Sequence, residues 1–72
     1  MNRLYVQAIK NIRQKDVYYE TDHPQSVVIV KGEIGEVTSY ENTHLNIFVR
    51  FPSRVIPMYC PRTHLEWAKG PV

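Results

Sequence analysis

The chain has 72 residues and a formal net charge of +2, from nine Lys or Arg against seven Asp or Glu. This length fits one domain, residues 1–72, in which roughly 60% of the unfolded chain's surface can be buried, and so small a core favours a binding partner. The basic residues are spread from Arg3 to Lys69. This spread argues against a dedicated nucleic-acid patch.

Cysteine usage and hydropathy indicate the compartment. The single cysteine, Cys60, has no second thiol for a disulfide or a metal pair, so a reducing compartment is the simplest interpretation. The longest apolar run, Val27 to Val30, is far too short to span a membrane. The N-terminus lacks the basic-then-apolar pattern of a signal peptide. We therefore expect a cytoplasmic, soluble protein without membrane contact.

Residues 3–14 are ambiguous between strand and helix. Leu4, Val6 and Ala8 alternate as in a strand, whereas Tyr5, Ala8, Ile9 and Ile12 would share one helical face. We favour a strand with a bulge, because no helix-stop glycine follows Lys15 and the rest of the chain is rich in β-formers.

Residues 16–26 turn polar after a few β-formers and predict a loop long enough to present side chains. Within it, the following proline holds His23 extended. The next run, Val27 to Val30, shows no polar alternation, which is typical of a strand covered on both faces.

Residues 31–51 predict the hairpin around which the rest packs. In its Lys31-Gly32 turn and at Gly35, we expect a positive φ or a close backbone approach that larger side chains would obstruct. The first strand should run to Tyr40, followed by a short polar turn over residues 41–44.

The second hairpin strand, Leu45 to Phe51, has near-perfect alternation. One face should be core, and it carries Leu45, Ile47, Val49 and Phe51. The opposite face carries Asn46, Phe48 and Arg50. Phe48 is then exposed or half-covered, as part of either a second small cluster or a contact surface.

The C-terminal third predicts two more strands. Arg54 to Cys60 reads as a strand interrupted by Pro57, which places it at an edge or gives it a bulge. Residues 61–65 fit one tight 3-10 turn, and residues 66–68 can close the sheet. The predicted fold is all-β, a small five-stranded SH3-like barrel with one short 3-10 turn before the last strand.

The chain offers no evident catalytic or metal-binding set. Its histidines, at positions 23, 44 and 64, are about twenty residues apart and have no local metal spacing. Cys60, between a tyrosine and a proline, reads as an ordinary half-buried thiol rather than a nucleophile. Glu33 and Glu36 read as solvated charges, and KGxxG lacks the features of a phosphate loop. We predict no catalytic residue and no metal or cofactor bound by this chain.

Surface aromatic and basic residues are the better candidates for function. Tyrosines are amphipathic and suit interfaces, and arginines can bracket an acidic partner. The alternative for the tyrosines is that they cap a small core, an alternative that weighs more for Tyr19 and Tyr40. The predicted partner-binding residues are Tyr18, His23, Phe48, Arg50, Arg54 and Tyr59.

Several of these segments resemble a known family. The segment 17–37 is similar to the variable (alpha) chain of ferredoxin:thioredoxin reductase, where a strand ending in tyrosine leads through a His-Pro loop to a KGxxGEV turn. Asn42 to Leu45 and Phe48 to Phe51 resemble its Asn-Leu-Pro and Val-x-Phe strand. His64-Leu65-Glu66 resembles its closing acidic Leu-Glu.

The resemblance implies a non-catalytic SH3-like barrel that packs against a separate chain. That partner would carry an iron-sulfur cluster and a redox-active disulfide, and a lone Cys60 is consistent with cluster ligands that belong to the partner.

Three function classes follow. The first is an accessory or interaction subunit with a protein partner, which could be the iron-sulfur catalytic chain. The alternative is a nucleic-acid or ribosome-associated module, motivated by an isoelectric point near 8.9 and by Arg50, Arg54 and Phe48 on neighbouring predicted strands. The third is a small enzyme whose site forms only at a symmetry axis, and no residue specifically favours it.

Overall fold

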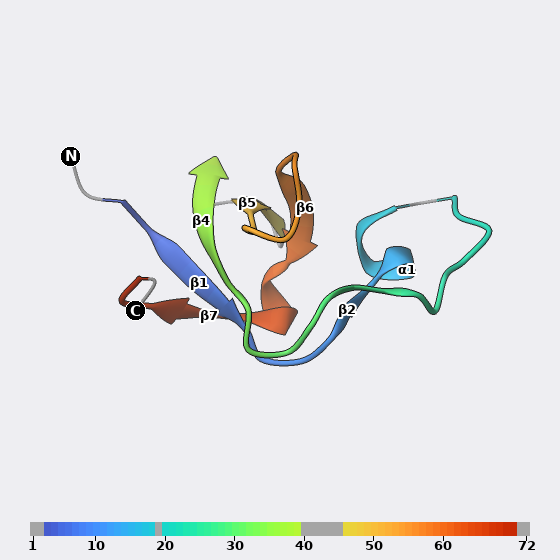
Figure 1. Ribbon diagram of the computed structural model, residues 1–72, viewed down its shortest axis with the longest axis horizontal. Coiled ribbons are helices and arrows are strands. Elements are labelled where there is room, and N and C mark those ends of the chain that lie inside the picture. The colour runs from blue at the N-terminus through green and yellow to red at the C-terminus, as the bar shows by residue number, and fades with distance from the viewer. Residues whose placement is uncertain (1–2, 19, 40–45, 71–72) are drawn as a thin grey trace.

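The computed structural model describes residues 3–18, 20–39 and 46–70. Strands and short helices follow one another along the chain (Figure 1). In order they are β1 (Tyr5–Ala8), β2 (Ile12–Arg13), α1 (Gln14–Val17), β3 (Val27–Ile29), β4 (Ile34–Ser39), β5 (Asn46–Arg50), β6 (Met58–Pro61), the 3-10 helix η1 (Arg62–His64) and β7 (Leu65–Ala68).

Five of the strands form one antiparallel sheet in the order β6-β5-β4-β1-β7, and β2 pairs with β3 separately. A strand near the N-terminus is confirmed, since β1 lies between β4 and β7. One bulged strand over residues 3–14 is not, because β2 pairs with β3 in the separate hairpin and the helical turn α1 begins at Gln14. The single tight turn before the last strand is also confirmed, as η1. Within the described residues the edge strands β6 and β7 do not pair with each other, so the structure shows a five-stranded sheet plus a small hairpin.

The alternation in β5 produces the predicted two faces. Ile47 and Val49 are buried, as is Phe51 directly after the strand, whereas Phe48 and Arg50 point outward and are exposed. The hairpin β4–β5 is antiparallel, with a register shift between Val37 and Ser39. The predicted turn at 41–44 and the predictions for Tyr19, Tyr40 and Leu45 lie outside the described residues.

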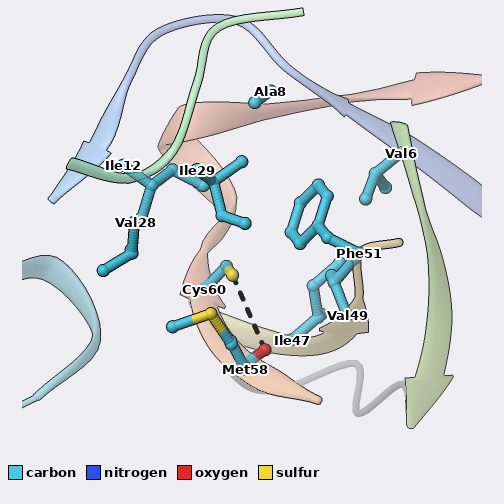
Figure 2. Packing of buried hydrophobic residues seen from close by; sticks show 10 residues of the cluster. All are labelled: Val6, Ala8, Ile12, Val28, Ile29, Ile47, Val49, Phe51, Met58 and Cys60. Atoms are coloured by element: carbon cyan, nitrogen blue, oxygen red, sulfur yellow. Dashed lines mark hydrogen bonds between the residues drawn. The ribbon is translucent and has the colours of Figure 1, made fainter. Parts of the chain in front are cut away.

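The core joins the sheet to the segment between β1 and β4, which we call the excursion (residues 9–33). Ile12 and Ile29 of the excursion are fully buried and lie on the side of the cluster that faces Met58 and Cys60 (Figure 2). The buried cluster comprises Val6, Ala8, Ile12, Val28, Ile29, Ile47, Val49, Phe51, Met58 and Cys60.

The two glycines of the KGxxG turn are required for different reasons. Gly32 has φ +99°, a conformation that residues with a side chain rarely adopt. Gly35 lies within β4, where a Cβ would come within 2.5 Å of Val49 Cγ1 and 2.9 Å of Phe51 Cδ1. Positive φ and close approach are therefore both confirmed, one at each glycine.

Two strand predictions need correction. The predicted strand from Arg54 begins only at Met58, because residues 52–57 form a loop closed by Arg54 N donating to Phe51 O (2.9 Å). Its edge position, predicted from Pro57, is confirmed. The run Val27–Val30 is not covered on both faces, since the exposed fractions of Val27 and Val30 are 37% and 57%.

The segment predicted as a loop from residue 16 overlaps a helical turn, α1. Asp16 Oδ2 accepts a hydrogen bond from the backbone N–H of Arg13 (2.9 Å), and Tyr18 N donates to Gln14 O (2.8 Å). The side-chain acceptor satisfies a free donor at the start of the turn, which stabilises so short a helix.

Candidate partner-binding surface

Tyr18 and Tyr59, far apart in the chain, line one surface groove of about 230 Å³. Tyr18 follows α1, Tyr59 lies in β6, and Asn46 at the start of β5 also lines the groove. We call this the aromatic groove, lined by Lys15, Asp16, Val17, Tyr18, Asn46 and Tyr59.

Phe48 extends this aromatic surface. It is the cross-strand partner of Tyr59 on the outer face of the sheet, and the ring centroids are 4.7 Å apart with the planes tilted by 34°. Such cross-strand aromatic pairs stabilise a sheet surface. Phe48 is 43% exposed and Tyr18 is 47% exposed, so neither caps the buried core. Tyr59 is half-buried.

The wall of the aromatic groove is attached to η1 by a polar contact that the sequence did not indicate. His64 Nε2 lies 3.5 Å from Asp16 Oδ2, and both side chains are largely covered. Burial lowers the pKa of His64; the Asp16 carboxylate opposes this by raising the pKa, and Lys10 adds a smaller lowering. The two residues are 48 positions apart. Only the folded topology brings them together.

Arg50 and Arg54 lie at a second groove, apart from the first. Arg50 Nη2 is 3.8 Å from Glu36 Oε1, while Arg54 Nε donates to Val28 O (3.0 Å). We call this the arginine groove; its volume is about 240 Å³ and its lining is Tyr5, Ile34, Gly35, Glu36, Arg50, Phe51, Pro52 and Arg54. The Arg54 side chain is therefore held by the backbone of β3. Arg54 lies in the loop at residues 52–57 and not, as predicted, on a strand next to that of Phe48.

His23 and Lys31 belong to neither groove's lining. His23 is exposed, and its backbone N–H donates to Thr21 Oγ1 (3.1 Å). Lys31 is exposed in the turn, where its backbone N–H donates to Asn11 Oδ1 (2.8 Å). The structure therefore brings together Tyr18, Phe48 and Tyr59 but not the remaining predicted partner-binding residues.

The thiol of Cys60 is fully buried, which corrects the expectation of a half-buried side chain. Burial raises the pKa of Cys60 to about 12, so the nucleophilic thiolate is scarcely populated at neutral pH. Across the described residues, no group of three or more His, Cys, Asp or Glu is placed to hold a metal ion. His44 lies outside them.

Both grooves are smaller than the roughly 300–1,000 Å³ typical of small-molecule sites. In the described part of the chain, no helix has the length and apolar character to cross a membrane.

No protein-family model, characterised protein or solved structure matches the chain. The resemblance to the reductase variable chain has support only from the quoted residues.

Proposed function

We propose that the chain is a non-catalytic accessory or interaction subunit that binds a protein partner through the aromatic groove and Phe48. The observation that carries this proposal is the convergence of Tyr18 and Tyr59 on one groove, with Phe48 stacked beside Tyr59 and open to solvent. Aromatic side chains are enriched at protein interfaces and among the residues that dominate binding energy. A groove of this size suits a partner's side chains better than an enzyme substrate.

The proposed architecture is a small SH3-like barrel. The order of strands in the sheet supports it, because β1 lies between the last strand, β7, and the consecutive strands β4, β5 and β6. A further support is η1, which connects the two edge strands β6 and β7 through a three-residue turn. A short connection of this kind brings the two edges of a curved sheet toward each other.

The partner that the sequence resemblance suggests is the iron-sulfur catalytic chain of a ferredoxin-dependent thioredoxin reductase. The inaccessible Cys60 supports an arrangement in which every cluster ligand belongs to the partner. The proposed role of the present chain is then to bind and stabilise that partner.

The nucleic-acid alternative draws less support from the same residues. Arg50 lies beside Glu36, and Arg54 donates to a backbone carbonyl, so both basic groups have contacts within the fold. Phosphate recognition relies on basic side chains that can release counterions when they bind. We therefore retain the protein-binding function as the proposal.

Affinity purification of the tagged full chain from its native source tests the function. The wild type should retain one partner, identified by mass spectrometry, and the double variant Tyr18→Ser/Phe48→Ser should lose it. A matched control is Leu4→Ser/Val30→Ser, which removes two comparably exposed hydrophobic side chains elsewhere. Retention by the first variant, or no partner for the wild type, would contradict the proposal.

Iron and acid-labile sulfide analysis of the same complex tests the partner's identity. A partner with both supports the reductase assignment. A partner without them overturns that assignment while leaving the interaction function in place.

A further inference from the structure

A row of side chains crosses three neighbouring strands on the outer face of the sheet. Tyr5 in β1 pairs with Glu36 in β4, and Glu36 pairs with Arg50 in β5. Directly opposed residues of antiparallel strands lie on the same face of a sheet. The other face carries the buried Val6 and Val49, so this row lies on the side that is open to solvent. All three residues of the row line the arginine groove.

The arginine groove gathers positive charge around the carboxylate of Glu36. Arg50 Nη2 lies 3.8 Å from Glu36 Oε1, and Arg3 Nε lies 3.4 Å from Glu36 Oε2. Arg54 adds a third guanidinium to this part of the surface. Three arginines and one glutamate have a net charge of +2, which equals the formal net charge of the whole chain, since six basic and six acidic residues remain elsewhere. The groove therefore holds the excess positive charge.

The guanidinium groups at this groove are accessible to a ligand. The side chains of Arg3 and Arg50 are 72% and 58% exposed, and Arg54 is also exposed. Among the described residues, the contacts with Glu36 and with the Val28 carbonyl each engage one nitrogen of an arginine. A guanidinium has several N–H donors, and surface ion pairs contribute little free energy. These contacts therefore orient the arginines and leave N–H groups for an anion.

A second acidic group near the groove is already occupied by donors of the fold. Ser53, in the loop at residues 52–57, donates from Oγ to Glu33 Oε1 (2.6 Å), and Glu33 Oε2 accepts from Val30 N (2.6 Å). Glu33 is not part of the groove's lining. Of the residues in that lining, only Glu36 opposes an incoming negative charge.

Apolar surface adjoins these charges. Tyr5 and Ile34 are half-buried in the lining, and Pro52 in it is exposed. The loop that begins at Pro52 also presents Val55, which is 94% exposed, and Ile56, which is 65% exposed. A ligand that fits the whole surface therefore combines negative charge with an apolar side chain.

We propose that the arginine groove binds an acidic segment of a protein partner. Carboxylates of the segment would pair with Arg50 and Arg54, and a neighbouring apolar side chain would cover the loop at residues 52–57. Complementary charge across an interface favours the correct partner, and guanidinium–carboxylate hydrogen bonds are among the stronger ones. A peptide can change from charged to apolar at each position, whereas a nucleic-acid backbone would bring a phosphate close to Glu36. The aromatic groove is separate, so the proposal does not rest on the proposed function.

Titration of the full chain with the synthetic peptide Glu-Asp-Leu-Glu-Asp-Leu, followed by nuclear magnetic resonance at about 20 mM salt, tests the proposal. The Nε–H signals of Arg50 and Arg54 and the amide signal of Ile34 should shift, with a dissociation constant below about 1 mM. The uncharged analogue Gln-Asn-Leu-Gln-Asn-Leu should bind at least about tenfold more weakly. Equal binding of the two peptides, or no shift of the groove signals, would overturn the proposal.

Two matched pairs of variants test the location of the site. Arg50→Gln should raise the dissociation constant of the acidic peptide at least about fivefold, whereas Lys10→Gln, at the other end of β1 from the groove, should change it less than about twofold. Glu36→Gln should lower the dissociation constant and Glu66→Gln in β7 should not. Thermal unfolding confirms that each variant is folded. Equal effects within either pair would mean that the peptide responds only to net charge, and would overturn the site.

Single-stranded oligothymidylate at the same salt concentration tests the nucleic-acid alternative. Binding tighter than that of the acidic peptide would overturn the assignment to a protein segment. Tyr18→Ser/Phe48→Ser should leave peptide binding unchanged, and a loss of binding in this variant would place the peptide in the aromatic groove instead. This proposal and the proposed function can therefore fail separately.

Discussion

The five-stranded sheet and the excursion both contribute fully buried side chains to the core, but they position these side chains in different ways. In the sheet, regular backbone pairing places alternate side chains such as Val49 in the core. In its described residues the excursion has only the two-residue strand β2, the three-residue β3 and one helical turn, yet Ile12 and Ile29 are as fully buried as Phe51. The comparison shows that a few well-placed aliphatic residues can fix a segment that has little secondary structure.

Polar contacts complete the attachment of the excursion. Arg54 connects the loop after β5 to Val28, and His64 in η1 meets Asp16 in α1. The second contact holds the helical turn that precedes Tyr18. The shape of the aromatic groove therefore depends on how firmly the excursion packs on the sheet.

The largest effects are expected from truncations in the shared core. Phe51→Ala should reduce the free energy of unfolding by about 3–5 kcal/mol and Ile29→Ala by about 2–5 kcal/mol, through lost burial and the cavities left behind. Urea unfolding followed by circular dichroism should show one transition in both. A separate early transition in Ile29→Ala alone would mean that the excursion unfolds independently of the sheet.

Alanine substitutions at Gly35 and Gly32 should give the next largest losses in free energy of unfolding, and the two can be compared directly. Gly35→Ala should destabilise the fold by about 3 kcal/mol, because the new methyl group would overlap Val49 and meet the backbone oxygen of Arg50 at 3.0 Å. Gly32→Ala has open space around it and carries only backbone strain, of about 1 kcal/mol. Thermal unfolding checks the order, and equal losses would contradict the close packing of β4 on β5.

Arg54→Ala should cost about 1 kcal/mol, the usual net value of a hydrogen bond. Its effect should be local, since the donor holds the Val28 carbonyl of the excursion. Amide hydrogen exchange should accelerate in β3 and stay unchanged in β1 and β4. Uniform acceleration would show that Arg54 supports the whole fold rather than this attachment.

The smallest expected effect is a dependence of stability on pH. The pKa of His64 is lowered in the folded state from its usual 6.5, so the unfolded chain takes up a proton first as the pH falls. Stability from this group is fully present above about pH 6.5 and declines as the pH falls through the folded pKa. His64→Gln should flatten the stability profile between pH 7 and pH 5, and an unchanged slope would assign it to other groups.

Much of the sheet could be predicted from local sequence. The alternation in β5, the proline before β6, Gly32 in the turn and Gly35 in β4 each reflect a constraint between residues close in sequence. The exposed Val55 and Ile56 misled the strand prediction, because β-branched residues favour strands whether or not a neighbour pairs with them. Contacts such as Asp16 with His64 depend on the folded path of the chain, and no spacing rule relates residues that far apart.

For the candidate surface, the sequence indicated aromatic residues as candidates, but it did not indicate which of them lie together. Tyr18, Phe48 and Tyr59 were predicted together with Arg50 and Arg54, which the structure places at a different groove. The difference arises because residue type indicates what a side chain can do, whereas only topology determines its neighbours.

The reactivity of Cys60 toward thiol reagents reports how often the core of this chain opens. Cys60 is 0% exposed in the cluster that joins the sheet to the excursion, so a thiol reagent can reach its sulfur only when the sheet and the excursion separate (Figure 2). The labelling rate in excess reagent therefore reports how often the layers separate, without any introduced probe. The same measurement repeated with a bound partner would show whether that partner slows the separation.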